Sequence, residues 1–296
     1  MPLALFDLSA PAKLNLFLHV LGRREDGMHL LQSVFVLIDW CDTLHVERRS
    51  DGKLQRHDLG VALPADDLCL RAATALQAQS GCTLGADISI DKQVPWGAGL
   101  GGGSSDAATT LLALNRLWRL GWSRHRLMAL GAGIGADVPF FIGGHNAFVE
   151  GVGERLTPLE LPALSYVVVK PPQALATGDI FVSKALKRDT EPVILAGLIE
   201  DAQRTGLSCA ATGEIFGRND LQPVAQDSCP DVLAAARWLQ GRYGNSRMSG
   251  SGSAVFARVD TVNDPEPGSD TPEARADWVV RRCRSLDHHP LLGWAD

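Results

Sequence analysis

The residues best suited to chemistry lie in one glycine-rich segment. Residues 95–106 read Pro-Trp-Gly-Ala-Gly-Leu-Gly-Gly-Gly-Ser-Ser-Asp, with five glycines within seven positions: Gly97, Gly99, Gly101, Gly102 and Gly103. Glycine lacks a Cβ atom, so backbone N–H groups can turn toward a bound anion, and a helix that follows adds its positive N-terminal end. A cradle of this size is typical of polyphosphate binding. We therefore expect a nucleotide-phosphate loop here.

Three common classes of phosphate loop fit this segment poorly. Gly97-x-Gly-x-x-Gly102 matches the dinucleotide pattern, but Val94-Pro-Trp separates it from the preceding strand, and no acidic residue follows about 20 positions on. The Walker A pattern fails because no lysine follows the glycines. The His-Arg-Asp and Asp-Phe-Gly segments of protein kinases are absent from the sequence.

Two further segments carry candidate polar groups. Lys13 and Asn15 lie on one face of a segment with alternating polarity, which predicts a half-buried strand over 13–21. Asp137 follows Gly131-Ala-Gly-Ile-Gly-Ala and precedes Val-Pro, at the edge between a loop and a helix. By pattern alone Asp137 is equally suited to be a helix N-cap or a catalytic base, whereas for Lys13 the pattern favours a solvated edge-strand residue.

The surrounding pattern predicts mixed strands and helices. Strands are expected at 34–38, 42–47, 86–90, 166–170 and 254–259, and helices at 66–79, 104–118, after Ser123, and at 177–186, 231–239 and 272–285. Ser104 or Ser105 would cap the helix after the glycines, with Asp106 in its first turn. The polar segment 260–271 is expected to be a mobile excursion.

Bulk properties restrict the class of protein. A chain of 296 residues fits two domains, and a pattern break near two prolines suggests a division into residues 1–160 and 161–296. The net charge of −6 argues against nucleic acid or an anionic membrane as a partner, and no apolar run is long enough to cross a membrane. The six scattered cysteines indicate free thiols in the cytoplasm rather than a metal site.

Three ordered segments resemble the motifs of the GHMP kinase superfamily. Pro11-Ala-Lys-Leu-Asn-Leu is similar to its first motif, Pro95 to Ser105 to its central motif, and Gly250-Ser-Gly-Ser-Ala-Val-Phe-Ala to its third. Within the superfamily, the chain is most similar to the branch that phosphorylates a cytidine diphosphate alcohol in isoprenoid precursor synthesis. The segments that carry this are Lys13-Leu-Asn-Leu, Gly22-Arg-Arg-Glu-Asp-Gly-Met-His, Gly99-Leu-Gly-Gly-Gly-Ser-Ser, Gly135-Ala-Asp-Val-Pro-Phe-Phe and Met248-Ser-Gly-Ser-Gly-Ser.

The resemblance implies an α+β fold of two domains with the active site in the cleft between them, and ATP with Mg²⁺ as cofactors. It implies that Asp137 is the base, and that Lys13 keeps its carboxylate ionised and stabilises the transferring phosphoryl group. The ATP-binding residues would be Pro95, Gly97, Gly99, Leu100, Gly101, Gly102, Gly103, Ser104, Ser105 and Lys92. The Ser105 or Ser104 hydroxyl is the candidate magnesium ligand.

The resemblance also implies a cytidine site. His29 matches the family histidine that hydrogen-bonds the base, whereas Met28 stands where the family has a stacking aromatic residue, and Phe181 is the expected second wall. Asn15, Asp137 and Gly250 would contact the substrate, with residues 249–253 as a backbone wall. Asp67 replaces a family asparagine near the adenine, which makes a direct adenine contact there doubtful.

Two alternatives stay open at this point. The chain could be another kinase of the superfamily, of the homoserine or mevalonate type, although the segment 22–29 argues against this. It could also be a non-catalytic pseudokinase sensor, which the presence of Lys13 and Asp137 disfavours. A monomer or weak dimer is expected.

Overall fold

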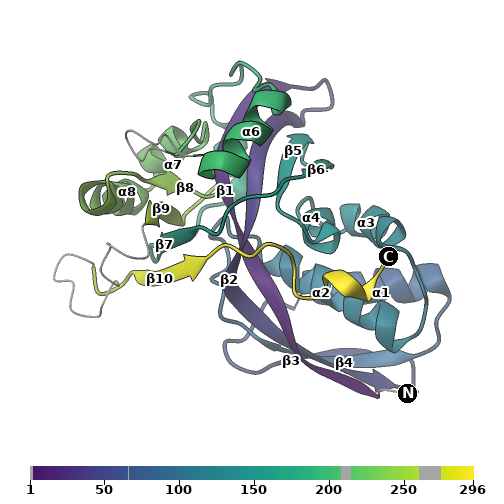
Figure 1. Ribbon diagram of the computed structural model, residues 1–296. Helices are drawn as coiled ribbons and strands as arrows, with labels where there is room; N and C mark the ends of the chain where they lie inside the picture. The colour runs from purple at the N-terminus through teal and green to yellow at the C-terminus, as the bar shows by residue number, and fades with distance from the viewer. Residues whose placement is uncertain (1–2, 66, 208–214, 260–274) are drawn as a thin grey trace.

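Two long antiparallel strands form the spine of the molecule. The computed structural model describes residues 3–65, 67–207, 215–259 and 275–296 (Figure 1). β1 (Ala4–Arg23) pairs with β2 (His29–Arg49) from Ala4 opposite Glu47 to Arg23 opposite His29. The connecting turn contains Gly27 at a φ of 87°, a value that glycine adopts without strain. Figure 1 shows this two-stranded ribbon running through the middle of the molecule, with the other elements on either side of it.

The first sheet grows from the free edge of β2. One half of β2 pairs with β4 (Gly85–Asp91), which lies beside the parallel β3 (Leu54–Asp58). The other half pairs with β5 (Ala147–Gly151), followed by β6 (Arg155–Pro158). This sheet forms the first body of the molecule together with helices α1 (Leu68–Ser80), α2 (Gly102–Leu117), α3 (Arg124–Ala132) and α4 (Val138–Gly143). The apolar side chains of these helices share one core with β2 and β4.

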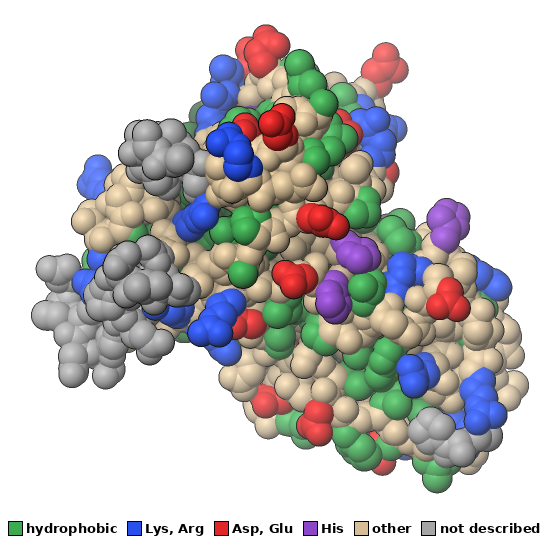
Figure 2. Space-filling model, in the orientation of Figure 1, with side chains coloured by type: hydrophobic (Ala, Val, Ile, Leu, Met, Phe, Trp, Pro, Cys, Tyr) green, Lys and Arg blue, Asp and Glu red, His purple; other side chains and the backbone are tan. Residues whose placement is uncertain are grey.

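The second body is built on a four-stranded antiparallel sheet. Its strand order is β10 (Val279–Arg284), β7 (Ser165–Lys170), β9 (Val255–Val259) and β8 (Arg247–Met248). The remaining helices are α5 (Thr177–Val182), α6 (Leu195–Thr205), α7 (Gln222–Ser228) and α8 (Pro230–Tyr243). Figure 2 shows the two bodies as distinct lobes, with histidine side chains at the waist between them.

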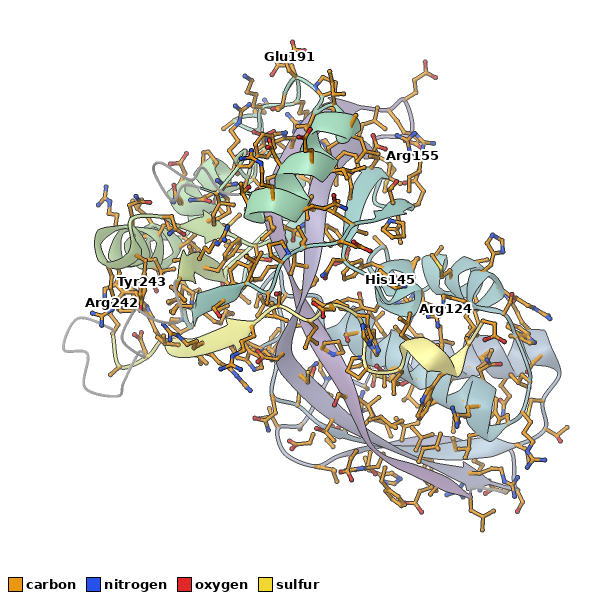
Figure 3. The ribbon with its side chains drawn as sticks, viewed as in Figure 1. Arg124, His145, Arg155, Glu191, Arg242 and Tyr243 are labelled. Carbon is orange, nitrogen blue, oxygen red and sulfur yellow. The ribbon has the colours of Figure 1, made fainter. Side chains whose placement is uncertain are left out.

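The C-terminal segment returns to the first body. It ends in a 3₁₀ turn, η1 (Leu292–Trp294), and Leu291 packs into the core of α1–α4. The N–H of His289 donates to the carbonyl of Gly144 at 2.8 Å, and Arg124 donates to the carbonyls of Ile142, Leu292 and Ala295. Arg124 and His145 both lie beside this segment (Figure 3). These bonds fix α4, whose first turn follows Asp137.

Most predicted elements are present, with four differences. The strand over 13–21 is not half-buried: both faces of β1 are covered there, with Lys13, Leu14 and Asn15 all at most 3% exposed. The prediction was wrong because the polar face is covered as well: the glycine loop packs on Lys13, and the segment 249–253 packs on Asn15.

The helix after the glycines begins earlier than predicted. α2 begins at Gly102 with Gly101 as N-cap, so Ser104 and Ser105 lie inside the helix and neither caps it. Asp106 consequently falls after the first turn. By contrast, Ser123 caps α3 as predicted, and Asp67 caps α1 through a bond from Leu70 N at 2.9 Å.

The helix predicted over 272–285 is absent from its described part, where β10 pairs with β7 instead. The local sequence is rich in helix formers, but the buried valines of β7 offer a complete strand edge, and this pairing overrides local preference. The helix predicted at 177–186 ends at Val182. The excursion predicted at 260–271 lies outside the described residues. Among the helices that the structure describes, none is long and apolar enough to cross a membrane.

Candidate active site

The glycine loop is held between β1 and the segment 249–253. The N–H of Lys13 donates to Leu100 O at 2.9 Å, and the Ser249 hydroxyl donates to Gly99 O at 2.8 Å. A Cβ atom on Gly99 would lie 2.1 Å from Ser249 O, and Gly99 has a φ of 73°. Glycine is therefore required at this position both by the close approach and by the backbone conformation.

Lys13 and Asn15 form a buried polar pair beneath this loop. The Lys13 ammonium donates to Asn15 Oδ1, and Asn15 Nδ2 donates to the Ser33 hydroxyl at 3.0 Å. Lys13 Nζ also lies 4.7 Å from the centre of the Phe35 ring. Burial lowers the pKa of Lys13, while the charge of Asp137 acts in the opposite direction. The lysine is thus a desolvated cation held next to a carboxylate, not a solvated edge residue.

Asp137 occupies the N-cap position of α4, but its side chain does not cap the helix. It makes no hydrogen bond to the first turn of α4, within the described residues, and instead lies with Oδ2 3.7 Å from Lys13 Nζ. The side chain is 30% exposed, so a second molecule can reach it. The geometry therefore separates the two readings of Asp137 that the pattern left open, and it favours a role toward a ligand.

The segment 249–253 completes this arrangement from the second body. A Cβ atom on Gly250 would lie 3.2 Å from both Asn15 Oδ1 and Gly99 O. Asn219 Nδ2 donates to Gly250 O and Met248 O, each at 2.7 Å, which fixes the segment. Lys13, Asn15, Asp137, the glycine loop and Gly250 are therefore brought together.

Lys92 is engaged with two carboxylates below the start of α2. Its ammonium donates to Asp42 Oδ2 and, at 2.6 Å, to Asp106 Oδ2. Burial disfavours the charge on Lys92, but the two carboxylates outweigh this effect and raise the pKa of Lys92. Burial also raises the pKa of Asp106 to about 7, and the charge of Asp42 adds to that shift. Since a Cβ atom on Gly102 would lie 3.1 Å from Lys92 Nζ, the triad supports the loop from beneath. A contact of Lys92 with the nucleotide stays a prediction.

The two serines differ in their access to a ligand. Ser105 is fully buried, and its hydroxyl has no hydrogen-bond partner among the described residues. Ser104 is partly exposed, and its Oγ lies 3.6 Å from the position of a Cβ atom on Gly135, two residues before Asp137. The described part of the chain holds no group of three or more His, Cys, Asp and Glu side chains suited to a metal. Ser104 is thus the more accessible of the two hydroxyls, and a magnesium contact of either serine stays a prediction.

His29 and Phe181 lie side by side at the far end of the β1–β2 ribbon. Their ring centres are 4.9 Å apart, and Met28 is 50% exposed next to them. His29 Nε2 accepts a hydrogen bond from Arg188 Nε at 3.0 Å. Burial lowers the pKa of His29, and the charges of Arg188 and Arg23 add to this. The imidazole is thus kept neutral near pH 7.

Asp67 is occupied by local structure. One of its oxygens caps α1, and the other forms an ion pair with the Arg56 guanidinium. The charge that replaces the family asparagine is therefore neutralised within the protein.

Sequence reasoning missed three positioning residues: Asp42, Ser33 and Arg188. Each acts through a contact between positions far apart in the chain, such as the 159 residues between His29 and Arg188. Asp42 Oδ1 also accepts from the N–H groups of Gln93 and Val94 at 2.6 and 2.7 Å. Nothing in the local pattern of these residues distinguishes them from other surface or strand residues.

A separate pocket of about 740 Å³ lies between β6, α6 and the C-terminal segment, lined among others by His145, Glu160, Ile199 and His288. It includes none of the residues of the glycine loop, nor Lys13 or Asp137.

Comparisons with known proteins identify the family. Residues 67–145 match the model of the GHMP kinases N terminal domain, and residues 196–277 match that of the GHMP kinases C terminal domain. A protein of Methylibium petroleiphilum named 4-diphosphocytidyl-2-C-methyl-D-erythritol kinase is 60% identical over 293 residues, covering 99% of this chain and 98% of that protein. One of the same name from Albidiferax ferrireducens is 55% identical, covering 99% of this chain and 96% of that protein.

Solved structures agree with the sequence comparisons. A crystal structure of 4-(cytidine 5′-diphospho)-2C-methyl-D-erythritol kinase superposes with a TM-score of 0.77 at 35% identity, over 94% of this chain and 98% of that chain. A homoserine kinase from Cytophaga hutchinsonii superposes with a TM-score of 0.67 at 16% identity, over 98% of this chain and 96% of that chain, and shares the fold alone. The predicted α+β fold of GHMP kinases is confirmed. The chain is a small-molecule kinase that belongs to the GHMP kinase family, among the relatives named 4-diphosphocytidyl-2-C-methyl-D-erythritol kinase.

Proposed function

We propose that the protein transfers the γ-phosphoryl group of ATP to the 2-hydroxyl of 4-diphosphocytidyl-2-C-methyl-D-erythritol, giving the 2-phosphate and ADP, in isoprenoid precursor synthesis. The names of relatives at 55–60% identity over nearly the whole chain support the substrate. The observation that carries the proposal is the Lys13–Asp137 pair, at 3.7 Å, set against a glycine loop. A kinase needs a phosphate cradle, charge stabilisation and a group that orients the acceptor hydroxyl, and these three are adjacent here.

The step follows from the placement of these groups. The acceptor oxygen attacks the γ-phosphorus and the bond to the bridging oxygen of ADP breaks, while the hydroxyl proton passes to the Asp137 carboxylate. The desolvated Lys13 ammonium stabilises negative charge on the transferring group more strongly than a hydrated cation would. The N–H groups at the start of α2 bind the phosphates of ATP.

The polar residues around the Lys13–Asp137 pair keep these groups in register. Asn15 receives the Lys13 ammonium and so aims it toward Asp137, and Ser249 bonds both the Asn15 N–H, at 3.2 Å, and Gly99 O. Mg²⁺ is proposed as the counter-ion of the ATP phosphates, where it would neutralise charge on the β- and γ-oxygens. The Ser104 hydroxyl would hold it, since Ser105 is fully buried.

The substrate base is proposed to bind beside His29 and Phe181. A neutral imidazole offers one donor and one acceptor, and the exposed Met28 thioether can pack on a base face without stacking as a ring. We also expect the protein to act in the cytoplasm. We expect it to be a monomer or weak dimer, and sedimentation of the purified chain would test this oligomeric state.

A coupled ADP-release assay tests the function. We expect turnover with the diphosphocytidyl alcohol and none with homoserine or mevalonate at the same concentration. Phosphorylation of homoserine or mevalonate alone would assign the chain to another kinase of the family, and no ADP release with any acceptor would favour a non-catalytic sensor.

A further inference from the structure

One arginine from the second body bonds both the His29 side chain and the backbone of Phe181, the two residues of the proposed base site. Arg188 lies in the segment between α5 and α6. Its Nε donates to His29 Nε2 at 3.0 Å, and its Nη2 donates to Phe181 O and Ser183 O, each at 2.8 Å. Its Nη1 donates to Leu186 O at 3.0 Å. The guanidinium is therefore held in a fixed plane, and it links His29 to the C-terminal end of α5, which carries Phe181.

This contact determines which nitrogen of His29 carries the proton. An arginine Nε always bears hydrogen, so it can only donate, and His29 Nε2 must accept. In a neutral imidazole the proton then lies on Nδ1. No side chain or carbonyl of the described residues bonds His29 Nδ1, so this N–H is available to a ligand.

We propose that Arg188 is a positioning residue that fixes His29 as a hydrogen-bond donor at Nδ1, and that it thereby selects a cytosine over a uracil in the substrate. The inference rests on the proposed function for the identity of the base. Cytosine N3 and O2 are acceptors, whereas uracil carries hydrogen on N3. A fixed Nδ1–H donor can bond to N3 of cytosine, whereas it meets the N3–H donor of uracil. A site that depends on this hydrogen bond therefore rejects a base that cannot accept it.

The charges around His29 maintain this state. Burial, Arg188 and Arg23 all lower the pKa of the imidazole, and they are the groups that set it. Protonation would place a hydrogen on Nε2 directly against Arg188 Nε–H. Base binding is thus expected to weaken as the pH falls below the ordinary histidine value of 6.5 toward this lowered pKa.

The first test is spectroscopic and uses the free full-length protein. The ¹⁵N shifts of His29 distinguish a proton on Nδ1 from one on Nε2. We expect wild-type protein to show Nδ1–H alone, and Arg188→Met to show a mixture of both tautomers with a higher His29 pKa. Lys187→Met is the matched control, since Lys187 is 59% exposed and pairs only with Asp189 in the described structure. An unchanged tautomer in Arg188→Met overturns the proposal.

The second test is kinetic. With the cytidine substrate, Arg188→Met should raise KM by about tenfold, the value of one lost hydrogen bond, with little change in kcat. The ratio of kcat/KM for the cytidine substrate to that for its uridine analogue should fall by a similar factor. Arg188→Lys keeps the charge but not the planar fork, so it should resemble Arg188→Met and still fold.

The outcomes separate this inference from the proposed function. Wild-type protein that shows Nδ1–H at His29 but does not phosphorylate the cytidine substrate would contradict the proposed function and the base selection, not the role of Arg188 in the tautomer. Full activity with mixed tautomers, or unchanged base discrimination in both Arg188 variants, would contradict the inference while the function stands.

Discussion

Lys13 Nζ lies 3.7 Å from Asp137 Oδ2, and the two residues come from different parts of the fold: β1 carries the lysine, and the N-cap of α4 carries the aspartate. The lysine is 3% exposed, whereas the aspartate side chain is 30% exposed. The pair thus places a buried cation behind a carboxylate that a substrate can reach.

Replacing the carboxylate of Asp137 should remove turnover and leave the fold intact. Asp137→Asn keeps the shape but cannot accept a proton, and general-base catalysis contributes about 10²–10⁴ in rate. We expect kcat to fall by this factor in the ADP-release assay. The thermal midpoint should fall only slightly, because the side chain does not cap α4 in the described structure and only its charge opposite Lys13 is lost. A kcat within threefold of wild type would remove Asp137 from the mechanism.

The charge on Lys13 should set the alkaline limit of activity. Because burial lowers its pKa below the usual 10.5, the ammonium is lost at a lower pH than in a free lysine, and kcat should decline there. Lys13→Arg keeps a charge that does not titrate, so the remaining activity should persist to higher pH. Lys13→Met should lose about 10²–10³ in kcat. An identical alkaline limb in wild type and Lys13→Arg would show that another group titrates.

Gly99 and Gly103 offer a matched pair within the loop. A Cβ atom on Gly99 would meet Ser249 O at 2.1 Å in a backbone with φ of 73°, whereas one on Gly103 would lie 3.8 Å from its nearest neighbour, Leu68 Cδ1. Gly99→Ala should destabilise the protein by about 2–3 kcal/mol in urea unfolding, through strain and displacement of the segment 249–253. Gly103→Ala, inside α2, should be neutral or stabilise by up to about 1 kcal/mol. Equal effects would contradict the packing described here.

The triad below the loop should respond unequally to its two simplest replacements. Lys92→Met leaves Asp42 and Asp106 buried without a cation and should cost about 3–5 kcal/mol in urea unfolding. Asp106→Asn should be much milder because the pKa of Asp106 is raised to about 7.

The pH dependence of this replacement has a definite sign. A carboxyl with a raised folded pKa contributes stability below its usual value of 3.8 and loses it as the pH rises through 7. Asp106→Asn removes that loss, so its stability relative to wild type should improve by about 2.7 kcal/mol between pH 5 and pH 8. A constant difference across this range would show that Asp106 is ionised throughout.

His289 should make the fold sensitive to acid. Its side chain is fully buried, its Nδ1 accepts from Leu291 N at 3.1 Å, and burial lowers its pKa to about 3. Between pH 6.5 and pH 3 the unfolded chain binds a proton that the folded chain does not. The free energy of unfolding should therefore decrease by about 1.4 kcal/mol for each unit by which the pH is lowered.

The control for this prediction is the neighbouring histidine. His289→Asn keeps an acceptor near Nδ1 but does not titrate, so its urea midpoint should vary less over this range. His288→Asn, at an exposed position, should retain the wild-type slope. The same slope in His289→Asn would assign the acid sensitivity to other groups.

The sequence by itself determined the class of this protein, because the features that define it are local. The glycines of residues 97–103 read directly as a phosphate loop, since the lack of a Cβ atom is a property of each residue alone. The order of three short motifs was enough to predict the family and its α+β fold. The same motifs contain Lys13, Asp137 and Gly250, which lie together in the structure.

Only the tertiary structure decided how these residues act together. The burial of Lys13 depends on the glycine loop and on Phe35, which come from other segments of the chain. The engagement of Lys92 depends on Asp42 and Asp106 from different elements, and the strand β10 forms because β7 offers it an edge. The link from Arg188 to His29 spans 159 residues. Such contacts arise from the packing of distant segments, and the free energy of that packing exceeds the local preferences that a sequence pattern reports.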